Sequence, residues 1–308
     1  MRCIVTGGSG FIGGHLARRL QQMQHQVLVV DKVWQPNSGL AGVAVEICDL
    51  SLLTDVFKSF NPDIVFHLAG VADARAVLAY PVESIHINIV GTSCVLEAAR
   101  QAEVKRVILA SSSWVYNAMP VGLIDENEAF LPSGGGHIYT STMIARELLA
   151  HDFHRLYHLP FTLLRYSPVY GPGMWPGLAL SSFIQAAQAG GPLVIFGDGQ
   201  DSRAFIYVDD LINAFIAALQ TVASNQVYNI EGPRSITINE LATHVSDLFG
   251  GIKIVHRAES TRRGELHYSG RTISCEKIRQ DLNWMPHVDI DEGILHVLKE
   301  LGIPIRPV

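Results

Sequence analysis

Three glycines near the amino terminus have the spacing of a loop that holds a diphosphate. Gly7, Gly10 and Gly13 lie between a β-branched run and the start of a helical pattern. Residues without a Cβ permit a tight turn and let the backbone approach phosphate oxygens closely. The amide groups at the start of the following helix, and its positive dipole end, attract the same anion. This strand–loop–helix context favours a dinucleotide site over an ordinary glycine turn.

A carboxylate ends the next predicted strand, about 20 residues beyond the glycine loop. Asp31 is placed to accept hydrogen bonds from both hydroxyls of an adenosine ribose, and it would repel a 2′-phosphate. The sequence therefore favours NAD over NADP as the cofactor, although the adjacent Lys32 weakens this preference. The alternative interpretation of Asp31 is a solvated turn residue.

Short β-branched runs alternate with longer helical patterns in the first half of the chain. The predicted strands are 2–6, 26–31, 63–67, 106–111 and 161–165, and the predicted helices lie near 11–24, 51–60, 83–102 and 139–157. Strands separated by helices form a parallel sheet that is covered on both faces. We therefore predict an α/β fold, with a Rossmann-type doubly wound parallel sheet and a smaller C-terminal α/β substrate lobe.

Glycine and proline punctuate shorter elements after about residue 170. We expect residues 1–170 to form the NAD-binding Rossmann domain, with later segments near 203–230 returning to it. Residues 171–308 would form most of the substrate-binding lobe, and the active site would lie in the cleft between the two parts.

Composition excludes several classes of function. The 308 residues carry a net charge of −6, with 48% hydrophobic and 17% charged residues, which is typical of a globular protein with a sizeable core. An acidic balance disfavours nucleic acid as a partner, and no apolar run or leader indicates a membrane span or signal peptide. The four cysteines have no metal-like spacing, so we expect reduced thiols, a cytoplasmic location and no metal site.

Seven further segments resemble, in the right order, those of the extended short-chain dehydrogenase/reductase family, specifically its NAD-dependent nucleotide-sugar epimerases and dehydratases. They are 49–50, 67–70, 88–92 (N-x-x-G-T), 110–116, 165–172 (R-x-x-N-x-Y-G-P), 197–210 (G-D-G…R-D-F…Y-V-x-D) and 282–286 (L-G-W-x-P). Two departures are Pro168 at the asparagine position and Ala204 at one acid. The resemblance covers nearly the whole chain.

The resemblance implies which residues contact the cofactor. They are Gly7, Gly10, Phe11, Ile12, Gly13, Asp31, Lys32, Asp49, Leu50, Leu68, Ala69, Gly70, Asn88, Tyr139 and Tyr166. Asp49 and Leu50 would meet the adenine, and the segment 67–70 would line the cofactor after its strand.

The resemblance also assigns the chemistry. A tyrosine, here Tyr139, takes the proton from a sugar hydroxyl while hydride passes to the nicotinamide. Ser112 would hydrogen-bond the same oxygen, with Ser113 as its neighbour. The alternative is that these serines only satisfy the end of a strand.

Met143 occupies the position where the resemblance implies a lysine, four residues after Tyr139 and on the same helical face. A phenol with a pKa of about 10 is anionic in about one molecule in a thousand at pH 7, and a nearby ammonium would favour the anion. A thioether carries no charge and is a weak acceptor. We therefore expect activity to be impaired. Three origins fit Met143: an engineered replacement of the lysine, a natural variant with its base elsewhere, or a natural binder without catalysis.

The reaction implied is epimerisation at C4 of a UDP-sugar through a transient 4-keto intermediate. Dehydratases of the family carry an acid pair after the catalytic hydroxyl residue, because elimination needs an acid and a base. Here Ser113 and Trp114 take those positions. A C4 ketoreductase or dehydratase of the same family remains an alternative. A second alternative, from another functional class, is a catalytically silent protein that binds NAD or a nucleotide sugar.

The sugar nucleotide needs cations for its diphosphate, and the resemblance points to Arg203 and Arg262, since guanidinium groups offer forked donors to phosphate. The alternative is that each is a surface arginine. Val194 and Phe196 resemble the strand beside the uracil, and Ser269 would leave room for an N-acetyl group. The helical stretches 83–102 and 139–157 carry apolar stripes that pair in family homodimers, although a stripe equally indicates core.

Overall fold

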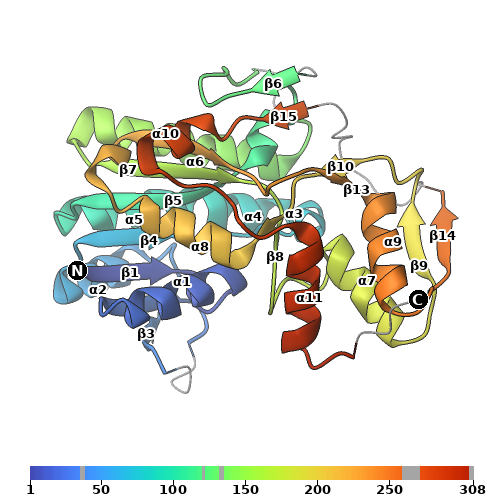
Figure 1. The fold of residues 1–308 in the computed structure, drawn as a ribbon. Helices are drawn as coiled ribbons and strands as arrows, with labels where there is room; N and C mark the ends of the chain where they lie inside the picture. The colour runs from blue at the N-terminus through green and yellow to red at the C-terminus, as the bar shows by residue number, and fades with distance from the viewer. Residues whose placement is uncertain (35–38, 120–121, 132–134, 259–270, 305–308) are drawn as a thin grey trace.

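The centre of the computed structural model is a seven-stranded sheet in which every strand pairs in parallel with its neighbours. The structure describes residues 1–34, 39–119, 122–131, 135–258 and 271–304. Along the sheet the strands are β12 (Gln226–Ile230), β7 (Phe161–Tyr166), β5 (Arg106–Ser112), β4 (Ile64–His67), β1 (Arg2–Thr6), β2 (Gln26–Asp31) and β3 (Ala41–Ala44). Figure 1 shows this sheet with helices in front of and behind it, as the sequence predicts.

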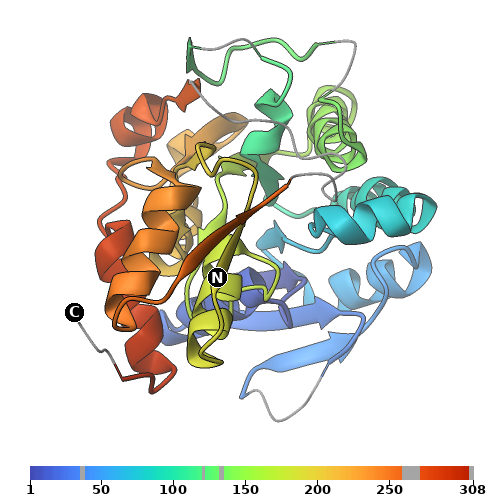
Figure 2. The same ribbon diagram turned by 90° about the vertical axis from the view of Figure 1, so that its right-hand side faces the viewer.

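Alternate residues of the central strands supply two separate cores. On β1, Cys3 and Val5 belong to one apolar cluster while Ile4 belongs to the other, because successive side chains point to opposite faces. The first face carries α1 (Phe11–Gln22), α8 (Val208–Ala217) and α10 (Glu276–Leu282). The second carries α2 (Leu50–Phe60), α5 (Gly91–Gln101) and α6 (Ile138–Tyr157), which stack along one side of the sheet in Figure 2.

A smaller body continues the first core beyond the carboxyl ends of the strands. It contains α7 (Ala179–Gln188), β9 (Leu193–Phe196), α9 (Ile238–Leu248), β14 (Ile254–Arg257) and α11 (Ile290–Glu300). Short strand pairs join the two bodies: β8 (Val169–Tyr170) with β11 (Ile206–Tyr207), β10 (Ser202–Arg203) with β13 (Ile236–Thr237), and β6 (Gly122–Ile124) with β15 (Arg271–Ile273). The segment after residue 203 returns to the larger body, where β12 joins the sheet and α8 packs against it. The domain boundary at residue 170 stays a prediction.

The helix predicted at 83–102 differs in one respect. It consists of α4 (Pro81–Ile85), a π-helical turn at His86–Val90 and then α5, with the short α3 (Ala74–Ala79) before it. In the π turn, Asn88 points inward and bonds both backbone groups of Val71. The next residue is Gly91, where a Cβ would lie only 2.5 Å from the Ile47 side chain, so this position favours glycine. A wide turn of this kind aims a side chain that a regular helix would place elsewhere.

A buried ion pair fixes α6 against the sheet. Arg165 on β7 donates from Nη2 to Glu147 Oε2 at 2.6 Å, and Ser111 on β5 bonds the same carboxylate. The two charged side chains are 5% and 1% exposed. The guanidinium also bonds the hydroxyl of Tyr116, which in turn donates to Asn229 on β12. The pair therefore ties α6 to three adjacent strands.

Replacing Glu147 by glutamine should destabilise the protein by about 3–5 kcal/mol, because the Arg165 charge would stay buried without its partner. The matched control is Glu97→Gln on α5, whose partner Arg100 is exposed. That variant should unfold at nearly the wild-type denaturant concentration, because exposed ion pairs contribute little. Equal midpoints for both variants in urea unfolding would contradict the account.

Candidate active site at the carboxyl edge of the sheet

The predicted site residues gather at one edge of the sheet. All seven strands run in the same direction, so their carboxyl ends share an edge, and ligands of such sheets bind there. The glycine loop follows β1, Asp31 ends β2, residues 68–70 follow β4, and Ser112 ends β5. Ser112 pairs in register with Tyr166, the last residue of β7. The structure thus brings the cofactor loop and the hydroxyl groups together.

The glycine loop is shaped for close approach. Gly7 has a φ of 74°, and a Cβ on Gly13 would lie 2.2 Å from the Gly7 carbonyl oxygen. Gly10 begins α1 without any side-chain cap, and the first turn of α1 contains no acid. The first amides of this helix are therefore available to an anion, whereas Asp49 caps α2 with its own carboxylate. These features fit a pyrophosphate.

The residues around the loop complete this cradle. Asp31 accepts the backbone N–H groups of Ser9 at 3.0 Å and Val33 at 3.4 Å, so its carboxylate stands beside the loop. Phe11 and Ile12 open α1, whereas Lys32 and Leu50 are exposed. Leu68, Ala69 and Gly70 border the loop from β4, since a Cβ on Gly7 would lie 2.7 Å from Ala69 N. Asn88 holds the next residue, Val71, through its amide.

The two hydroxyl groups assigned to proton transfer are in contact. The Ser112 hydroxyl lies within reach of the Tyr139 phenol, and it accepts the backbone N–H of Trp114. Burial raises the pKa of the Tyr139 phenol above its usual value; the Ser112 contact and the charge of Arg146 act in the opposite direction. The Trp114 ring meets the Tyr139 ring edge-on at 5.6 Å. Tyr139 is thus held between a hydroxyl and an aromatic wall.

Met143 contributes no charge to this site. Its side chain is 3% exposed and lies in an apolar cluster with Val115, Tyr116, Met119 and Ile124. The structure instead places Arg146, which the sequence analysis did not select, where its charge favours the phenolate of Tyr139 and so lowers the pKa of that phenol. The signal was available in the spacing: Arg146 follows Tyr139 by seven residues, two turns along the same helical face.

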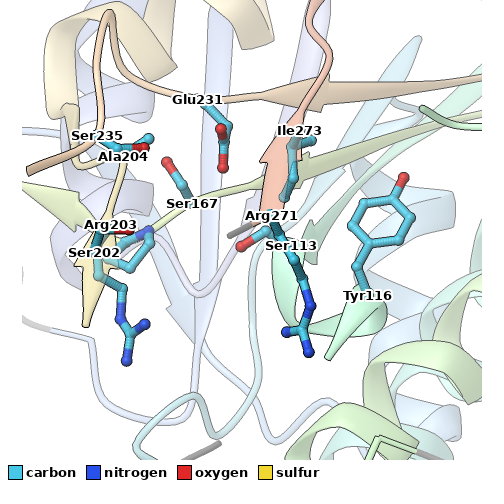
Figure 3. Close-up of a pocket in the computed structure, with 11 residues that line it drawn as sticks. Ser113, Tyr116, Ser167, Ser202, Arg203, Ala204, Glu231, Ser235, Arg271 and Ile273 are labelled. Atoms are coloured by element: carbon cyan, nitrogen blue, oxygen red, sulfur yellow. The ribbon is translucent and has the colours of Figure 1, made fainter. Parts of the chain in front are cut away.

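A pocket is lined from both bodies (Figure 3), and its residues include Ser113 but not Ser112 or Tyr139. Its lining residues include Ser113, Tyr116, Ser167, Arg203, Ala204, Glu231, Ser235, Arg271 and Ile273. The side chains of Arg203 and Arg271 extend in the same direction in Figure 3. Burial raises the pKa of the Glu231 carboxyl to about 8, so this acid is largely neutral at pH 7. Two guanidinium groups and several hydroxyls suit an anionic, hydroxylated ligand.

The remaining predicted substrate residues are not all in this pocket. Arg203 lines it, and sequence analysis missed Glu231 and Arg271, which lie far apart in the chain. Val194 and Phe196 lie on β9 in the smaller body, outside the lining set. Arg262 and Ser269 lie outside the described residues.

Within the described ranges, no helix is long and apolar enough to cross a membrane. The same residues contain no group of three His, Cys, Asp or Glu side chains placed to hold a metal ion.

The comparison with known proteins agrees with this geometry. Residues 3–230 match the model of the NAD dependent epimerase/dehydratase family. The chain is 30% identical over 307 residues to UDP-glucuronate 4-epimerase of Thermodesulfobacterium geofontis, covering 94% of this chain and 93% of that protein.

Solved structures are similar as well. UDP-glucose 4-epimerase of Thermotoga maritima, solved with UDP-glucose, superposes with a TM-score of 0.90 at 28% identity, over 98% of this chain and 99% of that one. UDP-glucuronic acid 4-epimerase of Bacillus cereus, solved with UDP-glucuronic acid and NAD, gives 0.87 at 26% identity, with 98% and 99% covered.

The chain therefore belongs to the NAD-dependent epimerase/dehydratase family, and its cofactor is NAD. The predicted Rossmann-type fold is confirmed.

A methyl group on Gly13 should weaken NAD binding by about tenfold or more, roughly 1.4 kcal/mol, because the Gly7 carbonyl would have to move. Gly14→Ala is the matched control on the same helix, since its Cβ would have its nearest neighbour at 3.5 Å, an ordinary contact. Calorimetric titration of cofactor-stripped protein with NAD measures both. Equal loss of affinity in the two variants would contradict the proposed role of the loop.

Proposed function

We propose that the protein interconverts the C4 epimers of a UDP-sugar through a 4-keto intermediate. The observation that carries the proposal is the contact between the Tyr139 phenol and the Ser112 hydroxyl at the cofactor edge of the sheet. Bound NAD would take hydride from C4 and return it. The residues of the chain must then manage one proton and hold the substrate.

Tyr139 is the group that moves the proton. As the C4–H bond breaks, the phenolate form of Tyr139 removes the proton from the C4 hydroxyl, and a carbonyl forms. Ser112 donates a hydrogen bond to the same oxygen and holds it in place. When hydride returns to the opposite face of C4, the Tyr139 phenol gives its proton back. One acid–base residue therefore serves both half-reactions.

The pocket supports a nucleotide-diphosphate sugar as substrate. Arg203 and Arg271 would contact the diphosphate, because each guanidinium can donate forked hydrogen bonds to phosphate oxygens. Ser113 and Ser167 also line the pocket and would offer their hydroxyls to the sugar. The neutral Glu231 carboxyl can donate as well as accept, which suits sugar hydroxyls.

Epimerisation fits this site better than dehydration. Elimination of water from C5 and C6 needs an acid and a base next to the tyrosine. Ser113 and Trp114 follow Ser112 in the chain, and neither is a carboxylic acid. Glu231 is the acid that lines the pocket, and its proton is held at neutral pH.

Met143 favours the second candidate, a silent protein that binds NAD or a nucleotide sugar. Retention of Tyr139 and Ser112 in contact argues for catalysis, because binding alone does not need a proton-transfer pair. The two functions differ in one observable: an epimerase converts substrate, and a silent binder only retains it.

Incubation with UDP-glucose, UDP-N-acetylglucosamine and UDP-glucuronate should give the C4 epimer of at least one, measured by ¹H NMR. Tyr139→Phe should lower kcat by about 10²-fold or more, because the proton acceptor is lost. Tyr157→Phe, at the exposed end of the same helix, is the matched control and should retain the wild-type rate. Binding of all three sugars without conversion of any would favour the silent binder.

A further inference from the structure

A buried cation lies on the tyrosine helix one turn beyond Met143. Arg146 is 2% exposed and stands three residues after Met143 and seven after Tyr139. With 3.6 residues per turn, these positions share one face of α6. The face that carries the phenol therefore also carries a permanent positive charge, because a guanidinium keeps its proton in proteins.

The hydrogen bonds of Arg146 hold this charge at the carboxyl edge of the sheet. Its Nη2 donates to the Ala69 carbonyl at 2.8 Å, its Nη1 to the Ala110 carbonyl at 3.0 Å, and its Nε to Thr92 Oγ1 at 3.1 Å. Ala110 lies two residues before Ser112 on β5. A Cβ on Gly70 would lie 2.8 Å from Nη2, so the absent side chain of Gly70 makes room for the guanidinium.

No carboxylate neutralises Arg146 within the described part of the chain. All three of its bonds go to uncharged oxygens, whereas Arg165, also buried, pairs with Glu147. A buried charge without a counter-ion is costly to retain. Formation of a phenolate at Tyr139 would supply the missing negative charge.

We propose that Arg146 is the positioning cation for Tyr139, and that it supplies from the next helical turn the fixed positive charge that a lysine at position 143 would otherwise provide. This inference rests on the proposed role of Tyr139 as the proton acceptor. It explains how a site with an uncharged side chain at position 143 retains a tyrosine and a serine in contact.

The packing of Met143 fits this arrangement. Its thioether fills an apolar cluster with Val115, Met119 and Ile124. An ammonium in that cluster would be desolvated, and it would stand one helical turn from the Arg146 charge. A lysine at 143 and an arginine at 146 are therefore alternatives rather than partners.

Other titratable groups face Tyr139 from the neighbouring elements. Tyr166 on β7 has a pKa raised by burial, and its interaction with Tyr139 is repulsive when both ionise. His137, which caps α6, accepts the Tyr139 backbone N–H with Nδ1. His67 on β4 bonds Thr6 and Thr92, and burial together with Arg146 lowers its pKa well below the usual value. Of these neighbours, Arg146 is the permanent cation.

The test measures ionisation of Tyr139 directly, by the ultraviolet difference absorbance between each variant and the same variant carrying Tyr139→Phe. Arg146→Gln should move the Tyr139 titration to higher pH by about one unit or more, which is about a tenfold loss of phenolate at a fixed pH below the transition. Its pH–rate profile with the sugar that turns over should shift in the same direction. Arg146→Lys should keep both near the wild-type position.

Arg106→Gln is the matched control. Arg106 is also buried and bonds only the backbone carbonyls of Leu219 and Gln220, but it lies at the opposite end of β5. This variant should lose stability without moving the Tyr139 titration. An unchanged titration in Arg146→Gln, or an equal shift in Arg106→Gln, would overturn the proposal.

Exchange of the two positions gives a second test that holds even if Arg146→Gln does not fold. Met143→Lys alone should not raise the rate at pH 7. Met143→Lys combined with Arg146→Met should titrate Tyr139 closer to the wild-type pH than a variant that loses Arg146 and keeps Met143. A higher rate from Met143→Lys with Arg146 intact would show that the arginine does not act as the cation. If no sugar turns over but the titration shifts as expected, the epimerase function fails and the role of Arg146 stands.

Discussion

The buried ion pair between Glu147 and Arg165 is the interaction on which the site depends. It fixes the register and rotation of α6 against β5 and β7, with both charges almost completely removed from water. Tyr139 and Arg146 lie on that same helix, so their distance from Ser112 and from the cofactor edge follows from how this pair seats α6. A small rotation of α6 would separate the phenol from the serine.

The two halves of the site use opposite physical means. The glycine loop lacks side chains, and no side chain caps the start of α1. The first backbone amides of α1 are therefore free to bind an anion. At the tyrosine the structure works by burying charge and removing water. Desolvation alone would disfavour the phenolate. A compensating cation or cofactor charge is therefore required for proton transfer, and Arg146 is the residue positioned to provide it.

Much of the fold follows from the sequence because parallel strands are buried on both faces and read as apolar runs. The five predicted strands of the sheet are present, with ends displaced by at most one residue. The strand Ala41–Ala44 was missed because three of its four residues are alanine or glycine, which carry little strand signal. The π-helical turn before α5 was missed because Asn88 is drawn inward by Val71, a contact that helical periodicity does not encode.

The site was predicted unevenly for a physical reason. Residues fixed by local motifs, such as Gly13 and Asp31, lie where the pattern indicates. Glu231 directly follows β12 and Arg271 begins β15, and the two meet only through tertiary packing, so no local spacing connects them. Arg146 lies on the same helix as Tyr139, but its helical position alone does not show that its guanidinium bonds the carbonyls of Ala69 and Ala110 at the carboxyl edge of the sheet.

The most direct test of the central claim is to follow a deuterium atom placed at C4 of the UDP-sugar that the protein converts. Our account predicts that the epimeric product keeps deuterium at C4, because the hydride leaves and returns within one site while Tyr139 exchanges only a proton. Mass spectrometry and ¹H NMR report its position. Deuterium found at C6, in water or in added free cofactor would contradict epimerisation through a transient 4-keto sugar.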